Sequence, residues 1–230
     1  MNSTHSKITQ HLKKNPWYEG SFELFEYGNF PAECPWNEFL EQNQKEFVHK
    51  IFQPLESSIP NTVRNLIESC KDVFALLADN EWFLIYVINE DVFLCGGEPN
   101  VSPVLSNDVI NDGWKLPVEL KTFYKIHNGF GYLWYLGMFW ISDCIVPDYK
   151  LETLNALFTS LLEHEPDIIL DFDPKSILQF FYNGAGDAQC FYKTEDKEVT
   201  TFFWDHETRE LYHPDDFWSF VDENLSELFR

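Results

Sequence analysis

The chain has 230 residues, of which 44% are hydrophobic and 17% aromatic, and its formal net charge is −22. This hydrophobic content is enough for a folded core and excludes intrinsic disorder as the state of the chain. The excess of 38 acidic over 16 basic residues excludes nucleic acid and anionic membranes as partners, since both would be repelled. It favours a basic protein as the partner.

The negative charge is concentrated in the last third of the chain. Residues 152–230 contain eighteen Asp and Glu against five Lys and Arg, which gives a net charge of −13 for that part. Acidic side chains also serve solubility alone, and that explanation stays open for the chain as a whole. The uneven distribution of charge favours binding of a cationic partner over solubility as the explanation.

The cysteines and the apolar runs indicate the compartment. Five cysteines are widely spaced without a Cys-x-x-Cys pair, which is typical of neither a disulfide framework nor a zinc ribbon. The first residues show no signal-peptide segment, and the apolar runs at 83–88 and 132–141 are shorter than the about 20 residues that cross a membrane. We therefore expect a cytoplasmic protein in a reducing environment, with no membrane partner.

The first hundred residues predict an irregular segment, two helices and two or three strands. Frequent Gly and Pro up to residue 36 indicate an irregular segment that packs through its aromatic side chains. Apolar residues at helical spacing predict helices over 36–53 and 61–70. Residues 72–97 are rich in Val, Ile, Phe and Tyr and predict strands separated by turn-forming pairs.

The segment LPVELKTFYKIHNGFG, residues 116–131, predicts a helix with a defined start and end. Pro117 suits the first helical turn, where its missing N–H would have no partner. Asn128-Gly129 suits a chain that turns through positive φ, with Phe130 folding back on Tyr124. The apolar stripe consists of Leu116, Leu120, Phe123, Tyr124 and His127.

The rest of the chain predicts strands followed by a helix. Residues 132–142 are strand-like, and 150–164 have helical spacing. Residues 176–212 alternate aromatic strands with turn clusters and predict a three-stranded antiparallel meander. Asp215 and Asp216 are N-capping residues for a final helix over 215–229. The turn clusters are NGAGD (183–187), KTEDKE (193–198) and DHETRE (205–210).

These elements predict an α+β fold, in which helices flank an antiparallel-rich mixed sheet. Three stretches in this order resemble the SUKH superfamily. They are LPVELKTFYKIHNGFG, with Leu116, Pro117, Asn128 and Gly129; FYNGAGDAQCFY, with Gly184 and Gly186; and VTTFFWDHETREL followed by FWSFVDENL.

The resemblance covers about residues 101–230 and implies a SUKH-like domain there. Residues 1–100 are then an N-terminal helical and aromatic extension packed on that domain. The superfamily includes bacterial toxin-immunity proteins and yeast-type regulators of cell-wall glucan synthesis. It implies a non-enzymatic binding module without cofactors, most simply an immunity protein that binds a basic toxin of nuclease or deaminase type. A regulatory scaffold is the alternative, because function resides in surfaces and not in the fold.

Three chemical alternatives come from the residues themselves. Cys190 with His206 and Asp205 resembles a hydrolase set, but Cys190 alternates with Ala188 and Tyr192 and is expected to face the core. Asp205, His206, His213 and Asp215 offer metal-ligand types, yet no recognised metal motif contains them. The glycine-rich NGAGD turn joins two strands and carries Asp187, which would repel a phosphate, so Asp187 is expected to bond amides of its own turn. We therefore predict no catalytic residue and no metal site.

Successive hairpin turns alternate between the two ends of a meander, so NGAGD and DHETRE should share one end. This places Asp187, Asp205 and Glu207 in one candidate partner-binding patch, with Trp204 as an aromatic anchor beside it and Asp215 and Asp216 nearby. Glu195, Asp196 and Glu198 form a separate candidate patch at the other end.

Overall fold

The structure is a computed structural model that describes residues 3–14, 21–90, 92–133, 144–155, 171–182, 187–194 and 199–229. The strands are β1 (Phe22–Glu26), β2 (Asp72–Ala78), β3 (Glu81–Val87), β4 (Phe93–Gly97), β5 (Phe130–Tyr132), β6 (Cys144–Ile145), β7 (Glu152–Thr153), β8 (Ile177–Tyr182), β9 (Ala188–Lys193), β10 (Val199–Asp205) and β11 (Glu210–Asp215). The helices are α1 (Ser3–Lys14), α2 (Gln44–Phe52), α3 (Pro60–Ser69), α4 (Asn107–Asn111), α5 (Val118–Tyr124) and α7 (Phe217–Glu227). Short 3₁₀ turns are η1 (Asn37–Phe39), η2 (Gln53–Leu55), η4 (Asp148–Lys150) and η5 (Pro174–Ser176).

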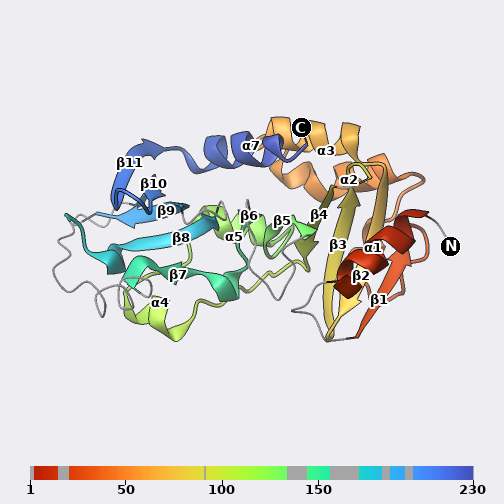
Figure 1. Cartoon of the computed structure of the whole chain (residues 1–230), viewed down its shortest axis with the longest axis horizontal. Coiled ribbons are helices and arrows are strands. Elements are labelled where there is room, and N and C mark those ends of the chain that lie inside the picture. Colours follow the sequence, from red (N-terminus) through yellow and green to blue (C-terminus); the bar gives the residue numbers. More distant parts are fainter. Residues whose placement is uncertain are drawn as a thin grey trace.

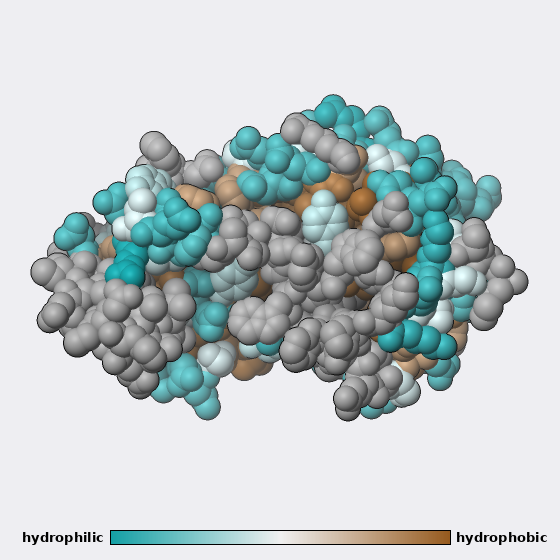
Figure 2. Space-filling view, in the orientation of Figure 1, coloured by the Kyte–Doolittle hydropathy of each residue, from teal (hydrophilic) through white to brown (hydrophobic). Residues whose placement is uncertain are grey.

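The strands join in one sheet, in the order β1-β2-β3-β4-β5-β6-β8-β9-β10-β11, with β7 beside β8. Helices α3 and α7 lie side by side over one face, and α1 lies against β1–β3 (Figure 1). Hydrophilic residues cover the outer side of α3 and α7, with hydrophobic residues visible beneath them (Figure 2). The prediction of an α+β fold is confirmed. Every pairing between described strands is antiparallel, so the expectation of a mixed sheet is wrong for this part of the chain.

Two hydrophobic clusters lie on opposite faces of the first strands. In β2, Val73 contributes to the larger cluster, whereas Phe74 faces the cluster that contains Ile8 of α1. This alternation follows from the two-residue repeat of a strand. The larger cluster also contains Val221 of α7, so residues from the first hundred and from the last helix share one core.

The elements predicted in the first hundred residues are mostly present. The helix at 61–70 is confirmed as α3, which opens on Pro60, and the strands at 72–97 are confirmed as three. The helix predicted over 36–53 is shorter, because the Asn43 side chain accepts a hydrogen bond from the backbone N–H of Glu46 at 3.0 Å and so fixes a start at Gln44.

The helix of the segment 116–131 also differs in detail. Pro117 is its N-cap residue, and Gly129 has the predicted positive φ, of 84°. Phe130 belongs to β5, and its ring lies 5.7 Å from that of His127 and 6.5 Å from that of Phe123. It therefore packs on these two side chains, where strand pairing with β4 holds it, and its predicted contact with Tyr124 stays a prediction.

Three corrections concern the second half of the chain. The meander has four strands, since three turns join four segments, and β11 pairs with β10 through a bulge at residues 202 and 203. The helix predicted from 150 does not include 150–153, where η4 and β7 lie, because Glu152 and Thr153 pair with β8. Asp216 is the N-cap of α7, whereas Asp215 ends β11. The predictions at 134–143, 156–170, Gly184 and Gly186 lie outside the described residues.

No described helix has the length and apolar character to cross a membrane.

Asp222 of α7 binds the N-terminus of α3. Its Oδ1 accepts the backbone N–H of Thr62 at 2.7 Å, and its Oδ2 accepts the backbone N–H and the side-chain amide of Asn61 at 3.2 and 2.8 Å. The N-cap residue of α3, Ile59, provides no side-chain acceptor. Asp222 is 6% exposed and serves as the missing cap from another helix.

Replacing Asp222 should test this contact. We expect Asp222→Ala to lower the free energy of unfolding by about 2–3 kcal/mol, because buried N–H groups lose a charged acceptor. Urea unfolding measures the change, and Glu223→Ala, at an exposed position of the same helix, is the matched control. Equal stability of the two variants would contradict the assignment.

His127 is buried between the first strands and β5. Its Nδ1 lies 3.0 Å from the Gly97 carbonyl oxygen, and its Nε2 lies 2.7 Å from the Tyr86 hydroxyl. Because a carbonyl only accepts, Nδ1 carries the proton and the Tyr86 hydroxyl donates to Nε2. A Cβ at Gly96 would lie 2.3 Å from the imidazole ring, so only glycine fits there. Burial lowers the pKa of His127 to about 4.

This lowered pKa predicts a pH dependence of stability. The unfolded chain protonates His127 near its ordinary pKa of about 6.5. The stabilisation of the folded state by the buried, neutral imidazole is therefore complete above that pH and is lost as the pH falls toward 4. The free energy of unfolding should fall by about 3 kcal/mol over this pH range. We expect His127→Gln to be less stable than the parent at neutral pH. Its free energy of unfolding, measured with urea, should decline less between pH 6.5 and 4. His49→Gln, at an exposed position, should keep the decline of the parent; an equal decline in His127→Gln would refute the prediction.

Candidate protein-interaction site

Asp187, the described residue of the NGAGD cluster, and the DHETRE turn lie at the same end of the meander, as predicted. Ala188 of β9 pairs with Trp204 of β10, and just beyond this pair Asp187 contacts His206. Asp187 Oδ1 lies 2.7 Å from His206 Nδ1 and accepts the backbone N–H of His206 at 3.2 Å. We call Asp187, Asp205, His206 and Glu207 the acidic sheet end.

The other candidate patch follows Lys193, which pairs with Val199 at the opposite end of β9 and β10. Glu195, Asp196 and Glu198 themselves lie outside the described residues.

The Asp205 side chain accepts hydrogen bonds from backbone groups within the DHETRE turn. Its Oδ1 accepts the backbone N–H groups of Glu207 at 2.8 Å and of Thr208 at 2.9 Å. Arg209 adopts a positive φ of 61° and donates its backbone N–H to the Asp205 carbonyl at 2.9 Å. These bonds fix the turn, so the exposed side chain of Glu207 projects from a rigid backbone.

Asp187 binds across to the neighbouring turn. The expectation that it also bonds amides of its own turn stays a prediction, because residues 183–186 lie outside the described part of the chain. The register pairs Trp204 with Ala188 and so brings Asp187 to Asp205 and to the next residue, His206, which offers two N–H donors. The hydrogen bond from His206 to Asp187, with the negative charges of Asp187, Glu207 and Asp205, raises the pKa of His206. Because the folded pKa is raised, the contribution of this bond is present below about pH 6.5 and is lost as pH rises through the raised value.

Removing the Asp187 charge should reverse this shift. We expect Asp187→Asn to lower the pKa of His206, because an amide does not stabilise the imidazolium as a carboxylate does. An NMR titration of the His206 ring protons measures it, with Glu223→Gln on α7 as the control of equal charge change. An unchanged His206 pKa in Asp187→Asn would disprove the cross-turn bond.

Trp204 is not the exposed anchor that the sequence suggested. It is 1% exposed and packs with Ala188 and Cys190, and its ring lies 5.9 Å from that of Phe172. Consecutive strand residues alternate between faces, and Trp204 lies on the face that Phe172 covers.

Tyr212 is a half-buried aromatic residue beside this end of the meander that was not predicted from the sequence. Tyr212 pairs with the half-buried Phe203 in β10, which puts both on one face. The Tyr212 hydroxyl donates to Glu210 Oε2 at 2.6 Å and lies 3.0 Å from Thr208 Oγ1. The two-residue spacing of Glu210 and Tyr212 in one strand was the signal for this contact.

Asp216 has a structural role away from this site. Asp215 pairs with Thr201, toward the end of β10 opposite to the DHETRE turn, so Asp215 and Asp216 do not lie near Asp205 as the sequence suggested. Its Oδ2 accepts the backbone N–H of Ser219 at 2.9 Å and the Ser219 hydroxyl at 3.0 Å, which caps α7. The side chain of Asp215 lies outside the described residues.

The arrangement gives no support to the hydrolase alternative. Cys190 is fully buried with Ala188 and Tyr192 in the core, as expected, and burial raises its pKa well above the ordinary thiol value. A nucleophilic cysteine needs the opposite shift. His206 is bound to Asp187 at the surface and makes no contact with Cys190 among the described residues.

The metal alternative takes a different form from the one suggested by sequence. Asp187, Asp205 and His206 can each offer a ligand atom, and these atoms lie within 4.8 Å of one another. His206 Nδ1 is engaged with Asp187, however, so a cation there would have to replace this bond. The side chain of His213 lies outside the described residues.

The fold and the three motifs define an α+β domain of the SUKH type. Residues 111–230 match the SMI1/KNR4 family (SUKH-1), which is more than half of the chain. The chain therefore belongs to this family, as the three motifs predicted. Searches of the curated proteins and of the solved structures found no significant match.

Proposed function

We propose that this protein is an immunity protein that neutralises a cognate basic toxin, of nuclease or deaminase type, by direct binding in the cytoplasm. The observation that supports this most is the acidic sheet end. It lies within the residues that match the family, and its two turns are fixed to each other by the contact between Asp187 and His206.

In this mechanism the protein blocks the basic cleft of the toxin through complementary charge and shape. A toxin that acts on nucleic acid needs a basic cleft, and carboxylates on a rigid turn match such a cleft with little loss of conformational entropy. Glu207 and Glu210 are exposed, and Tyr212 and Phe203 provide half-buried aromatic surface beside them. Charge-steered association of this kind slows as salt increases, because screening acts over ~8 Å at physiological ionic strength.

Affinity capture at low salt, followed by a toxicity assay, tests the proposal. The captured protein should be basic, should arrest growth when it is produced alone, and should be harmless when this chain is produced with it. Several weakly bound, non-toxic proteins would instead support a regulatory scaffold of the cell-wall regulator type. Capture of only neutral or acidic proteins would reject both the toxin and the electrostatic mechanism.

Charge reversal at the acidic sheet end should weaken binding of the captured partner. We choose Glu207→Lys with Glu210→Lys, because Asp187 and Asp205 hold the turns and their replacement would alter the backbone. Breaking interfacial charge pairs is worth ~2–5 kcal/mol, so the dissociation constant should rise at least about thirty-fold.

The matched control is Glu223→Lys with Glu227→Lys, at exposed positions of α7. Isothermal titration calorimetry compares the two double variants, and reversal of Glu195, Asp196 and Glu198 tests the other end of the meander. Binding that survives the first variant and fails in the last would place the interface at that other end.

A further inference from the structure

A second surface of the protein exposes apolar side chains around the 3₁₀ turn η4. Val101 is 71% exposed, Val104 69% and Tyr149 51%, whereas most large apolar side chains are buried. These three residues belong to segments joined by hydrogen bonds through Asp148. We call them the Tyr149 surface.

The backbone under the Tyr149 surface is fixed by a buried carboxylate. Asp148 is 6% exposed, and its Oδ2 accepts the backbone N–H of Val104 at 2.9 Å and the side-chain amide of Asn100 at 3.1 Å. Its Oδ1 accepts the side-chain amide of Asn128 at 2.7 Å, and its backbone N–H donates to Asn128 Oδ1 at 2.9 Å. The exposed apolar groups are thus held in place before any partner arrives, which reduces the entropy lost on binding.

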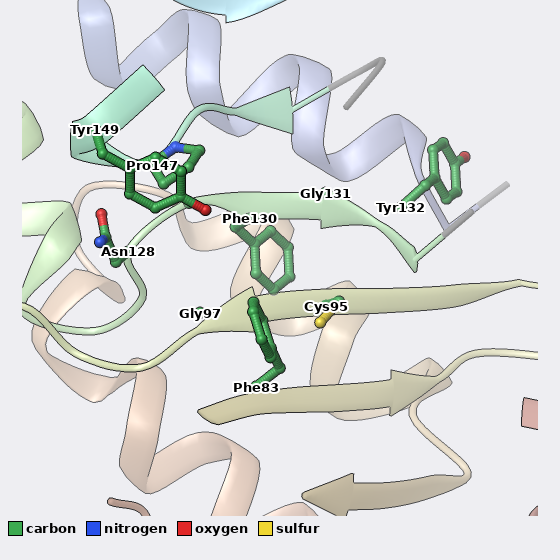
Figure 3. A pocket seen from close by; sticks show the side chains of 10 residues that line it. Phe83, Cys95, Gly97, Asn128, Phe130, Gly131, Tyr132, Pro147 and Tyr149 are labelled. Carbon is green, nitrogen blue, oxygen red and sulfur yellow. The ribbon is translucent and has the colours of Figure 1, made fainter. Parts of the chain in front are cut away.

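A hollow adjoins Tyr149 on the sheet (Figure 3). It is shallow, with a cavity volume of about 20 Å³, and Phe83, Cys95 and Pro147 line it with Tyr149. Gly97 lies in its wall, and a Cβ there would come within 2.5 Å of the Asn128 carbonyl oxygen. Close packing of the backbone therefore keeps this position free of a side chain.

Three carboxylates gather at the neighbouring end of β2, β3 and β4. Asp79 lies in the turn that joins β2 to Glu81 of β3, and Glu98 donates its backbone N–H to the Trp82 carbonyl at 2.9 Å. Partial burial, together with the charges of Glu98 and Asp79, raises the pKa of the Glu81 carboxyl. Within the described part of the chain, none of the three forms an ion pair with Lys or Arg.

This carboxylate group also acts on the Tyr149 surface. Partial burial, with the negative charges of Glu81 and Asp148, raises the pKa of Tyr149 to about 12. A cation placed beside Tyr149 would therefore meet both an aromatic ring and uncompensated carboxylates. Lys150 follows in the chain and forms no ion pair among the described contacts.

We propose that the Tyr149 surface and its hollow bind a segment of the partner protein that carries Lys or Arg next to apolar residues. The apolar residues pack on Val101 and Val104, and the cationic side chain lies along Tyr149 with its head toward Glu81 and Glu98. Long basic side chains suit this arrangement, because their stems bury on apolar surface and their heads interact with aromatic faces and carboxylates. The proposal rests on the proposed function, since it requires a basic partner.

The surface combines two parts of the chain. Asn128, Asp148 and Tyr149 belong to the residues that match the family, whereas Glu81 and Val104 precede residue 111. The residues before 111 thus add charge and an apolar edge to a family element, which gives them a role in selecting the partner.

Synthetic peptides test this assignment without the natural partner. The probes are N-acetylated octapeptides, Gly-Ser-Val-Leu-Xaa-Val-Gly-Ser amides in which Xaa is Arg, Lys, norleucine or Glu, titrated into the full chain labelled with nitrogen-15. We expect the Arg and Lys peptides to cause saturable shifts at the amides of Val104 and Tyr149 and to bind at least ten-fold more tightly than the other two. No preference for Arg and Lys, or shifts confined to residues 205–210, would overturn the proposal.

Variants separate charge from shape. Glu81→Gln with Glu98→Gln should remove the preference for Arg and Lys, and Tyr149→Ala should weaken every peptide that binds. Val118→Ser changes a valine that is 68% exposed on α5 and should leave all affinities unchanged. A preference that persists in the Glu81 and Glu98 variant would refute the assignment of the cation.

The same variants distinguish failure of this inference from failure of the proposed function. If the captured toxin loses affinity for Glu207→Lys with Glu210→Lys but not for Glu81→Gln with Glu98→Gln, the function stands and the inference is wrong. If no toxin is captured, the function is wrong, and the peptide titration still decides the inference.

Discussion

The hydrogen bonds from the start of α3 to Asp222 join the last helix of the chain to a helix from its first hundred residues. Asp222 comes from the last helix, and Asn61 and Thr62 come from a helix that precedes the residues matching the family. A carboxylate at a helix N-terminus satisfies N–H groups that have no partner within the helix, and it also interacts favourably with the helix dipole. No ion pair with Asp222 is found among the described residues, so backbone N–H groups and the side-chain amide of Asn61 balance its buried charge.

That contact determines how the main core is completed. Helices α3 and α7 lie side by side, and Leu66 and Val63 of the first are in the same cluster as Val221 and Leu225 of the second. The residues that match the family therefore do not bury α7 with their own side chains alone. The first hundred residues supply a layer of that core, which is a physical reason for them to remain next to the family part.

The sequence was informative where structure is local. Helical spacing located α3 and α7, turn chemistry located the meander, and Asn128-Gly129 indicated a positive φ that Gly129 adopts. Contacts between distant segments could not be read from it. Nothing near Asn128 in the sequence shows that its amide would both donate to and accept from Asp148, twenty residues later.

Trp204 and Asp187 show the same limit within the candidate site. Alternation in a strand assigns Trp204 and Phe203 to opposite faces, but which face is covered depends on Phe172, from a segment before the meander. Asp187 lies in a turn rich in glycine, where bonding to its own backbone is the usual outcome. Its contact with His206 depends on the register of β9 and β10, and register depends on the whole sheet.

The net charge of −22 is therefore a poor measure of what the surface can recognise. Charges farther from a partner than ~8–10 Å are largely screened, so only local groups determine binding. At the acidic sheet end, His206 offsets part of the negative charge of Asp187, and the exposed Glu207 and Glu210 remain for a partner. At the end of β2, β3 and β4, Asp79, Glu81 and Glu98 form no ion pair with a described residue, and partial burial together with their mutual repulsion raises the pKa of Glu81. A cation bound there would relieve that repulsion as well as gain its own attraction, which makes a small cluster of carboxylates more selective for a basic side chain than evenly distributed charge.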